Sequence, residues 1–496
     1  MILAPTASEI TPSVSDDHEY RGGRPMTTLS DGIAAELDAA LAGRVHRPGS
    51  AGYRESLSRI FFPDASRRTP PCVVHPRDTS DVATAMRIVS AGGGRVTARG
   101  GGLSSTCVDD SAVLMDLSVH LTRIDAHDGR VRVQGGATVG AVLEALTGSG
   151  RVIPVGIVGL AGFGLATRGG IGYLTRSAGL TLDHLVEVEL VRPDGEVVRL
   201  DADSTGTEAD LWWAVRGCAP SFGVVTAAEL RTVAQGPVHI DRAVVELDAL
   251  ADYFAVAPTL PRHTTMGAVL GYGADDDEPA LLVYTACRGS RAADLAEARE
   301  ATDAVVAGST RPPRFRSQTT GRYLSGLPEF AHPGPGGTDP PPIRAPGPGT
   351  SSERGHFFGK SVFVGPTLGD DVADGLRNAI TAAPTRACRI DFQHTGGALT
   401  DVDDASTAFW GRGAEWNVPL NAIWSDDAAT DRCEAWARAA LDVLAADTIG
   451  VYSVELRPGF AETERETEAA FGGNLARLRR LRDHIDPGRA LGVLPL

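Results

Sequence analysis

A stretch dense in glycine, residues 155–174, is the strongest constraint on what this chain can fold into. Seven glycines fall within eighteen positions, so neither a stable helix nor a regular strand can form there. The residues between them, including Leu160, Phe163 and Leu165, are too apolar for a free surface loop. The stretch therefore predicts irregular backbone that is kept for close approach to a ligand.

A shorter glycine loop, residues 100–102, precedes this stretch by roughly sixty positions. It lies between two expected strands, at residues 95–98 and 113–117. Glycines have no side chains, so backbone N–H groups can close on a bulky anion, and residues 104–106 add hydroxyl donors. A lone glycine run is as often only a tight turn. The second glycine stretch is what gives this loop weight as a ligand site.

Size and composition set the outer limits. A chain of 496 residues predicts two domains, and its net charge of -16 argues against non-specific binding to nucleic acid or anionic membrane. The six cysteines are scattered without metal-ligand spacing, which favours buried free thiols and no metal site. We see neither a long apolar run nor a secretory signal, so the expected location is the cytoplasm.

The first part of the chain alternates short strands and helices. Residues 1–28 are polar and patternless and predict a disordered leader, after which residues 29–232 have the alternating texture. Residues 79–81 offer caps to a helix at 82–91. A hairpin is expected around the turn Asp194-Gly195, because Asp-Gly between apolar alternations is a strong hairpin signal.

The second part predicts an antiparallel sheet flanked by helices, so the whole chain is expected to be α+β. The expected strands are residues 239–247, 265–270, 280–287 and 359–364, and the expected helices are 292–306, 368–382 and 428–445. A stretch rich in proline and glycine, residues 328–352, predicts a mobile loop or lid. One helix at 467–485 closes the chain.

Five segments carry, in order, a resemblance to a known family: residues 99–102; residues 162–172 with 177–184; residues 191–195; residues 210–217 with 222–226; and residues 471–478 with 486–487. With these segments the chain resembles the flavoprotein oxidases of the vanillyl-alcohol-oxidase and para-cresol-methylhydroxylase fold, in the berberine-bridge-enzyme-like branch. The resemblance implies a two-part FAD-binding domain, residues 29–232 and 465–496, around a substrate-binding domain, residues 233–464.

The resemblance also implies which residues bind the cofactor. The first loop would hold the FAD pyrophosphate with its backbone amides, and the second would pack along the flavin. The residues assigned in this way are Arg99, Gly100, Gly101, Gly102, Leu103, Ser104, Ile157, Gly162, Gly164, Gly169, Gly170, Gly172 and Val225.

Three departures from the family pattern bear on chemistry. Leu103 stands where many members attach the flavin through a histidine, and Ile157, or Val158 if the alignment slips by one, stands where some add a cysteine bond. We therefore predict FAD that is bound without a covalent link. Near the C-terminus the family has a tyrosine followed two residues later by asparagine; here Tyr452 is kept and Val454 replaces the asparagine.

Flavin-dependent oxidation of an alcohol or phenol needs a base near the flavin. Tyr452 is the first candidate by position, although an aromatic wall is an equally good interpretation. Glu455 is the second, but an odd separation along a regular strand would turn it to the face opposite Tyr452. His394 is a third candidate, with a capped turn as the alternative.

The leading functional interpretation is an FAD-dependent oxidoreductase that acts on a small or medium organic molecule in natural-product tailoring. A polyketide, an alkaloid or a glycoside would be typical substrates, with no nucleic-acid or membrane partner. The alternative is a non-redox enzyme on the same fold, a cyclase, lyase or isomerase, whose flavin is structural or lost.

Overall fold

The computed structural model describes residues 31–156, 159–273, 277–289, 291–321, 355–457, 459–492, 494 and 496. The expected leader at 1–28, the expected mobile loop at 328–352 and Ile157 lie outside these residues. No helix among the described residues is long and apolar enough to cross a membrane.

A small sheet begins the fold. Its strands run in the order β1 (Val45–His46), β2 (Val73–Val74), β4 (Ala112–Asp116) and β3 (Arg95–Arg99), and β2, β4 and β3 are parallel. Its helices are α1 (Asp31–Ala40), α2 (Ala51–Ser58), α3 (Pro63–Ser66) and α4 (Thr79–Ala91). The expected cap of α4 is corrected: Asp78 is the N-cap, and its carboxylate accepts from the Asp81 N–H at 3.0 Å.

A five-stranded antiparallel sheet follows. Its order is β5 (Ile124–His127), β6 (Arg130–Gln134), β10 (Val224–Arg231), β8 (Leu185–Val191) and β9 (Val197–Asp201). The predicted hairpin is confirmed, since β8 pairs with β9 around Asp194 and Gly195. Helices α5 (Val139–Ala145), α6 (Thr175–Ala178) and α7 (Gly206–Cys218) accompany it, and β7 (Arg151–Val152) pairs with β11 (Val233–Ala234).

The largest sheet has eight strands. Their order is β15 (Phe315–Gly321), β12 (Val238–Val245), β14 (Ala280–Cys287), β13 (Thr264–Gly271), β17 (Arg389–His394), β18 (Trp416–Trp424), β16 (His356–Val364) and β19 (Thr448–Val451). All its pairings are antiparallel, as the sequence predicted. The sequence missed β15, β17, β18 and β19.

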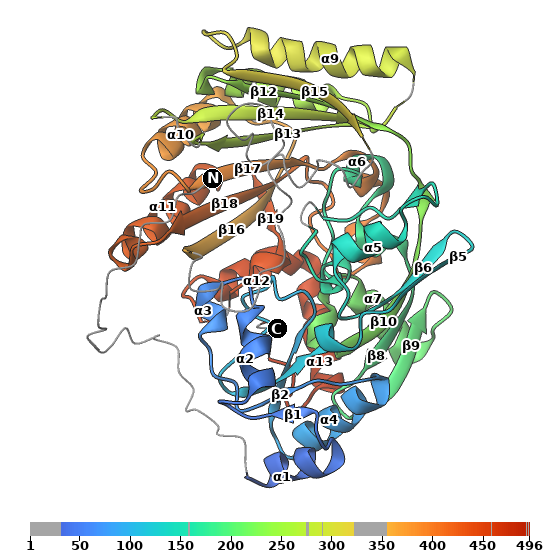
Figure 1. The fold of residues 1–496 in the computed structure, drawn as a ribbon. Coiled ribbons are helices and arrows are strands. Elements are labelled where there is room, and N and C mark those ends of the chain that lie inside the picture. Colours follow the sequence, from blue (N-terminus) through green and yellow to red (C-terminus); the bar gives the residue numbers. More distant parts are fainter. Residues whose placement is uncertain are drawn as a thin grey trace.

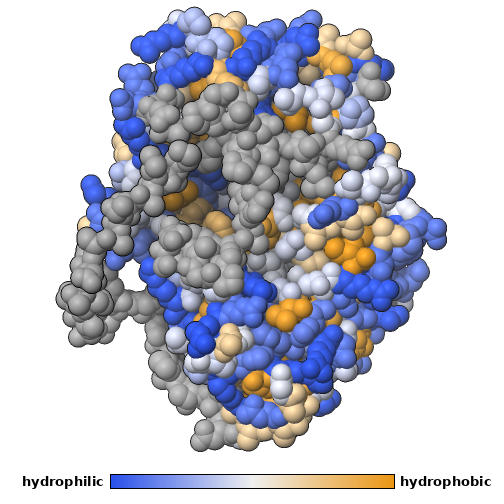
Figure 2. Space-filling model, in the orientation of Figure 1, coloured by the Kyte–Doolittle hydropathy of each residue, from blue (hydrophilic) through white to orange (hydrophobic). Residues whose placement is uncertain are grey.

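One face of this sheet packs against four helices. They are α8 (Leu250–Val256), α9 (Ala292–Ala307), α10 (Asp370–Thr381) and α11 (Thr430–Val443). Side chains alternate between the two faces, so Phe358, Val362 and Val364 of β16 enter this core. The other face turns toward the two smaller sheets, which Figure 1 shows below it. Hydrophilic residues dominate the coloured surface in Figure 2, where apolar residues occur in small groups.

Two helices, not the one expected at 467–485, close the chain: α12 (Thr463–Phe471) and α13 (Leu475–Ile485). They are separated at Gly472, which has a φ of +44° and packs against the ring of Trp410. Leu478 of α13 shares a core with Trp213 of α7. The end of the chain therefore returns to the part of the fold that contains the five-stranded sheet.

Candidate cofactor and active site

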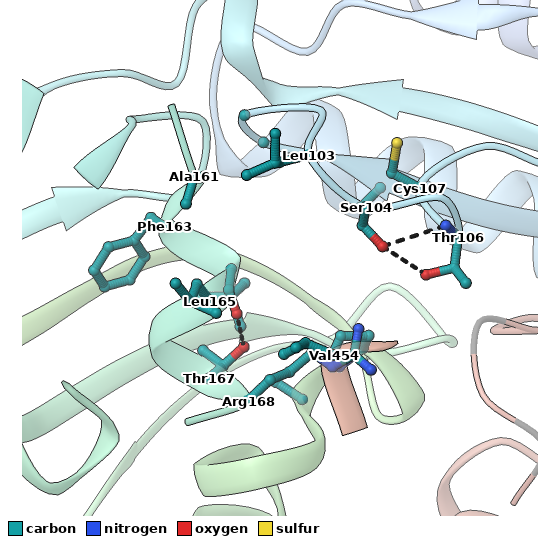
Figure 3. A pocket seen from close by; sticks show the side chains of 18 of the residues that line it. Leu103, Ser104, Thr106, Cys107, Ala161, Phe163, Leu165, Thr167, Arg168 and Val454 are labelled. Carbon is teal, nitrogen blue, oxygen red and sulfur yellow. Dashed lines mark hydrogen bonds between the residues drawn. The ribbon is translucent and has the colours of Figure 1, made fainter. Parts of the chain in front are cut away.

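A cavity of about 340 Å³ lies where the glycine-rich segments meet the large sheet. Figure 3 shows the loop that carries Leu103 and Ser104 facing the segment that carries Leu165 and Arg168 across this pocket. The other main contributors are residues 223–225 at the start of β10, Gln393 of β17, and Tyr452, Val454 and Glu455 after β19.

The two glycine loops meet backbone to backbone. A Cβ on Gly101 would lie 2.6 Å from the Leu160 carbonyl oxygen and 2.7 Å from the Gly162 Cα. A Cβ on Gly100 would lie 2.8 Å from the Gly135 carbonyl oxygen. Only glycine permits this packing. The close approach that the sequence predicted thus occurs between the loops themselves, along the wall of the cavity.

The first loop presents unused hydrogen-bond donors. Within the described part of the chain, the backbone N–H groups of residues 101–105 donate to no protein acceptor. Next in the loop, the Thr106 N–H donates to the Ser104 Oγ at 3.2 Å, which fixes the turn. Consecutive free N–H groups beside a cavity form an anion-binding concavity. This donor set fits the pyrophosphate of a dinucleotide.

Arg99 does not line the cavity. Its guanidinium is buried below the loop, where it forms an ion pair with Asp116 at 2.6 Å and donates to the Ser118 Oγ at 2.9 Å. Asp116 also caps the short turn that follows β4. Arg99 therefore anchors the base of the loop to the neighbouring strand.

The remaining residues assigned to the cofactor divide into two groups. Gly100, Gly101, Gly102, Leu103, Ser104, Gly162, Gly164 and Val225 line the cavity. Gly169, Gly170 and Gly172 lie behind the wall. Gly169, at a φ of +142°, packs against Tyr452, and the Gly172 N–H donates to the Thr175 Oγ1 at 2.9 Å.

Tyr452 lies at the end of the cavity nearest the large sheet. Its hydroxyl oxygen accepts from the Gly170 N–H at 3.0 Å, so the phenol holds the second glycine loop in place. Burial raises the pKa of Tyr452 to about 12. A phenol with this pKa is a poor proton acceptor near neutral pH.

Glu455 lines the same cavity, contrary to the expectation from strand alternation. The regular strand ends at Val451, and Ser453–Glu455 form a 3-10 turn that brings Tyr452, Val454 and Glu455 to one side. Within the described chain, the Glu455 carboxylate has no hydrogen-bond or ion-pair partner. Burial is the main reason that its pKa is raised, against the opposing effect of Arg457, Arg168 and Lys360.

Arg168 is a site residue that the sequence analysis missed. Its buried guanidinium lines the cavity and donates to the Ser453 carbonyl oxygen, but the Nε has no partner among the described residues. No described carboxylate forms an ion pair with it, and burial lowers its pKa. A lone arginine within a glycine-rich apolar run was the available signal.

Gln393 was also missed. The Ser361 Oγ donates to the Asn417 Oδ1 at 2.7 Å, and the Asn417 Nδ2 donates to the Gln393 Oε1 at 2.8 Å. The amide oxygen of Gln393 is thereby occupied, so its amino group is available to the cavity. The alternation of polar and apolar residues in β17 was the signal for it.

His394 lies outside the cavity, and its expected role is corrected. Its ring, fully buried, contacts Glu415 at 2.6 Å and Arg176 at 2.8 Å, and its Nδ1 accepts from the Met266 N–H. Burial, opposed by Glu415, lowers its pKa to about 4. Because Arg176 belongs to α6, the cluster joins the second glycine loop to β13 and β17. It is neither a base in the cavity nor a capped turn.

Comparison with known proteins agrees with this geometry. Residues 70–201 match the family model described as "FAD binding domain". An FAD-linked oxidoreductase of Dictyostelium discoideum is 24% identical over 92% of this chain and 94% of its own. The FAD-linked oxidoreductase sorD of Penicillium rubens is 27% identical, with 89% of this chain and 92% of that protein covered.

Solved structures share the fold. Chitooligosaccharide oxidase superposes with a TM-score of 0.77 at 20% identity and covers 94% of this chain and 100% of its own. Berberine bridge enzyme from Eschscholzia californica gives 0.76 at 17% identity, with 94% and 99% covered. The predicted resemblance is therefore confirmed: the chain contains an FAD-binding domain and has the two-part fold of the berberine-bridge-enzyme-like FAD oxidoreductases.

Proposed function

We propose that this protein is an FAD-dependent oxidoreductase that oxidises a small or medium organic molecule, with its flavin held without a covalent bond. One observation carries the proposal. The cavity has free backbone donors for a pyrophosphate at residues 101–105, and a carboxylate, Glu455, lines the same cavity beside the large sheet. A dinucleotide needs the first feature, and oxidation of a hydroxyl-bearing carbon needs the second.

Bound FAD would supply the acceptor for the hydride that leaves the substrate carbon. Residues 101–105 would hold its pyrophosphate, and Leu103 and Gly162 would pack against it. Arg168 would place a positive charge in the pocket, where it favours any negative charge that forms during the reaction. The loop residues would bind and orient the cofactor, and Arg168 would stabilise negative charge in the pocket. Their roles follow from their places in the cavity wall.

Glu455 is the better candidate base of the two that line the cavity. Within the described chain, its carboxylate forms no hydrogen bond or ion pair that would have to break before it accepts a proton. Its raised pKa makes it a stronger base than an exposed glutamate. Tyr452 has a pKa of about 12 and already accepts a backbone hydrogen bond. The substrate O–H proton would therefore move to a Glu455 carboxylate oxygen, while Tyr452 positions the second glycine loop.

Side-chain chemistry supports a flavin bound without a covalent link. Leu103 lines the cavity at the position that the family resemblance gives to an attachment histidine, and an aliphatic side chain forms no bond to a flavin ring. The cofactor would then be held by packing and by hydrogen bonds alone. Residues 29–232 and 465–496 would form its domain, and residues 233–464 the substrate domain.

The substrate would be a natural product such as a polyketide, an alkaloid or a glycoside, and the protein would work in the cytoplasm. The name of one relative supports an alkaloid substrate: (R)-6-hydroxynicotine oxidase of Paenarthrobacter nicotinovorans is 30% identical over 41% of this chain and 44% of its own. The free amino group of Gln393 fits an oxygen acceptor on such a molecule.

The alternative, a non-redox enzyme that retains a structural flavin, is favoured by Val454. This apolar side chain lines the cavity where the family resemblance places an asparagine, which removes a polar contact.

Anaerobic spectroscopy separates the two functions. The purified protein is mixed without oxygen with panels of hydroxylated polyketides, alkaloids and glycosides, and its visible spectrum is followed. Bleaching of the flavin by one class, with stoichiometric oxidised product, supports the oxidoreductase. Product formed while the flavin stays oxidised would assign the non-redox function.

A further inference from the structure

A second cavity, of about 260 Å³, lies on the helix side of the large sheet. Its polar lining includes Lys360 of β16, Asp442 of α11, and Arg465 and Glu466 of α12. Glu455 also lines it. The carboxyl group proposed as the base in the first cavity is therefore part of the wall of both.

The end of the sheet explains how one side chain reaches two cavities. β19 pairs with β16 only over Val362–Val364, and the last backbone bond runs from the Tyr452 N–H to the Ser361 carbonyl oxygen. Beyond it the 3-10 turn stands beside the uncovered edge of β16. A Cβ on Gly359 would lie 3.4 Å from the Glu455 Oε2. The Glu455 carboxyl group thus lies at the edge of the large sheet, between its two faces.

Lys360 is the one lysine in a chain whose 47 basic residues are otherwise all arginine. Its Nζ is buried and forms ion pairs with Glu466 at 2.7 Å and Glu462 at 3.1 Å. Arginine would also satisfy two carboxylates. What a lysine adds is the capacity to release a proton, since an arginine stays protonated in proteins.

A base that accepts a proton must lose it before the next turnover. Cofactor and substrate would fill the first cavity and would then separate the Glu455 carboxyl group from solvent on that side. The wall of the second cavity is mainly apolar but carries several charged side chains, and the cavity has room for several water molecules. It also contains two further groups that exchange protons, the Lys360 ammonium and the Glu466 carboxylate.

We propose that Glu455 returns its proton to solvent through the second cavity, with Lys360 and Glu466 as relay groups. This inference rests on the proposed role of Glu455. The substrate O–H proton forms the Glu455 carboxyl group; that O–H bond then breaks as the proton passes to Lys360. In the same step Lys360 passes one of its own protons to Glu466, so the lysine keeps its positive charge between its two glutamates, and Glu466 then releases that proton to water. One proton enters and one leaves, so the charge of the relay is unchanged.

Hydrogen–deuterium exchange of the Glu455 carboxyl group tests the route without any substrate. The FAD-bound protein is transferred from H2O to D2O at a pH below the raised pKa of Glu455. The shift of the carbonyl stretch of the protonated carboxyl is then followed by infrared spectroscopy. The band is assigned by its loss in Glu455→Gln.

A side chain that fills the second cavity should slow this exchange. We expect Ala469→Phe to slow it by about tenfold or more, while Ala293→Phe, on the exposed start of α9, exchanges at the parent rate. Lys360→Arg keeps the positive charge and donors for both glutamates but not the transferable proton. We expect it to slow exchange with an unchanged thermal midpoint, and Glu466→Gln gives a second test of the relay.

Exchange in Ala469→Phe at the parent rate would contradict the proposal that the Glu455 proton leaves through the second cavity. Slow exchange there, with parent exchange in Lys360→Arg and Glu466→Gln, would retain this exit and overturn the relay. Failure of the proposed function shows itself differently, as a flavin that stays oxidised through turnover, and leaves the exchange rates unaffected.

Discussion

Tyr452 and Glu455 line one cavity three residues apart, and burial has opposite consequences for their use as bases. Burial raises the pKa of the Tyr452 phenol to about 12, so the phenol stays protonated at neutral pH. Burial also raises the pKa of the carboxyl group from its usual value of 4.5, which makes the carboxylate a stronger base. In the sequence, Tyr452 was favoured as the base by its position. The effect of burial on the two pKa values favours Glu455 as the base instead.

Substitution at the two residues should separate these roles. We expect Glu455→Gln to lower kcat by about 10²–10⁴-fold with FAD still bound, the range for loss of a general base. Tyr452→Phe removes the acceptor of the Gly170 N–H, so it should weaken FAD binding and lower kcat by less than about tenfold. Steady-state kinetics and FAD titration measure both. A larger loss of kcat in Tyr452→Phe than in Glu455→Gln would reverse the assignment.

His394 should make the fold sensitive to acid. Its pKa is lowered to about 4 in the folded protein and returns to about 6.5 on unfolding, so between these values the unfolded chain binds more protons. Stability therefore falls as pH falls through this window, by up to about 3 kcal/mol.

Urea unfolding at several pH values checks the effect of His394. His394→Gln should be less stable at neutral pH but lose less stability between pH 6.5 and 4, whereas His484→Gln, at an exposed site, should keep the parent slope. Equal pH slopes in all three proteins would contradict the role of His394.

At the scale of elements, the contact between the two glycine loops defines the cofactor wall. Gly101→Ala would press a methyl group into the Leu160 carbonyl and the Gly162 Cα, so the loops must part. We expect at least about a tenfold loss of FAD affinity, because the N–H groups of residues 101–105 would move. Gly236→Ala, with nothing near its Cβ, is the matched control. FAD titration of the apoprotein measures both, and parent affinity in Gly101→Ala would refute the contact.

The order of the elements could largely be predicted, because glycine loops, the Asp-Gly hairpin and the apolar strands have local signals. The sequence could not place β17 and β18. On the sheet face that turns away from the helices, these strands carry polar residues that pair across the strands: Gln393 with Asn417 and Asp391 with Asn421. The alternation within β17 was a local signal, but the pairing between the strands is a tertiary contact that the alternation does not show.

The site was predicted at its first loop and less well at its far end. Glu455 was only the second candidate, because alternation along a regular strand argued against it and the sequence does not show that β19 ends at Val451. Arg168 and Gln393 were missed because their role depends on the cavity that they line, which forms only when distant segments come together. His394 had the composition of a base but lies in a separate buried cluster.

For the whole molecule, the single lysine provides a probe of the fold. The Lys360 side chain is 3% exposed and paired with two glutamates, so an amine-reactive reagent should not modify its Nζ in the native protein. After denaturation it should react fully. Peptide mass spectrometry before and after unfolding measures this, and rapid native labelling of Lys360 would contradict its buried ion pairs with Glu462 and Glu466.

The central claim is that this cavity holds FAD without a covalent bond. Its most direct measurement is acid precipitation of the purified protein, followed by chromatography and absorbance of the supernatant and the pellet. We predict a colourless pellet and a supernatant that contains intact FAD, about one molecule per chain. Flavin retained in the washed pellet would contradict the claim for Leu103, and a protein that neither contains nor takes up FAD would contradict the cofactor itself.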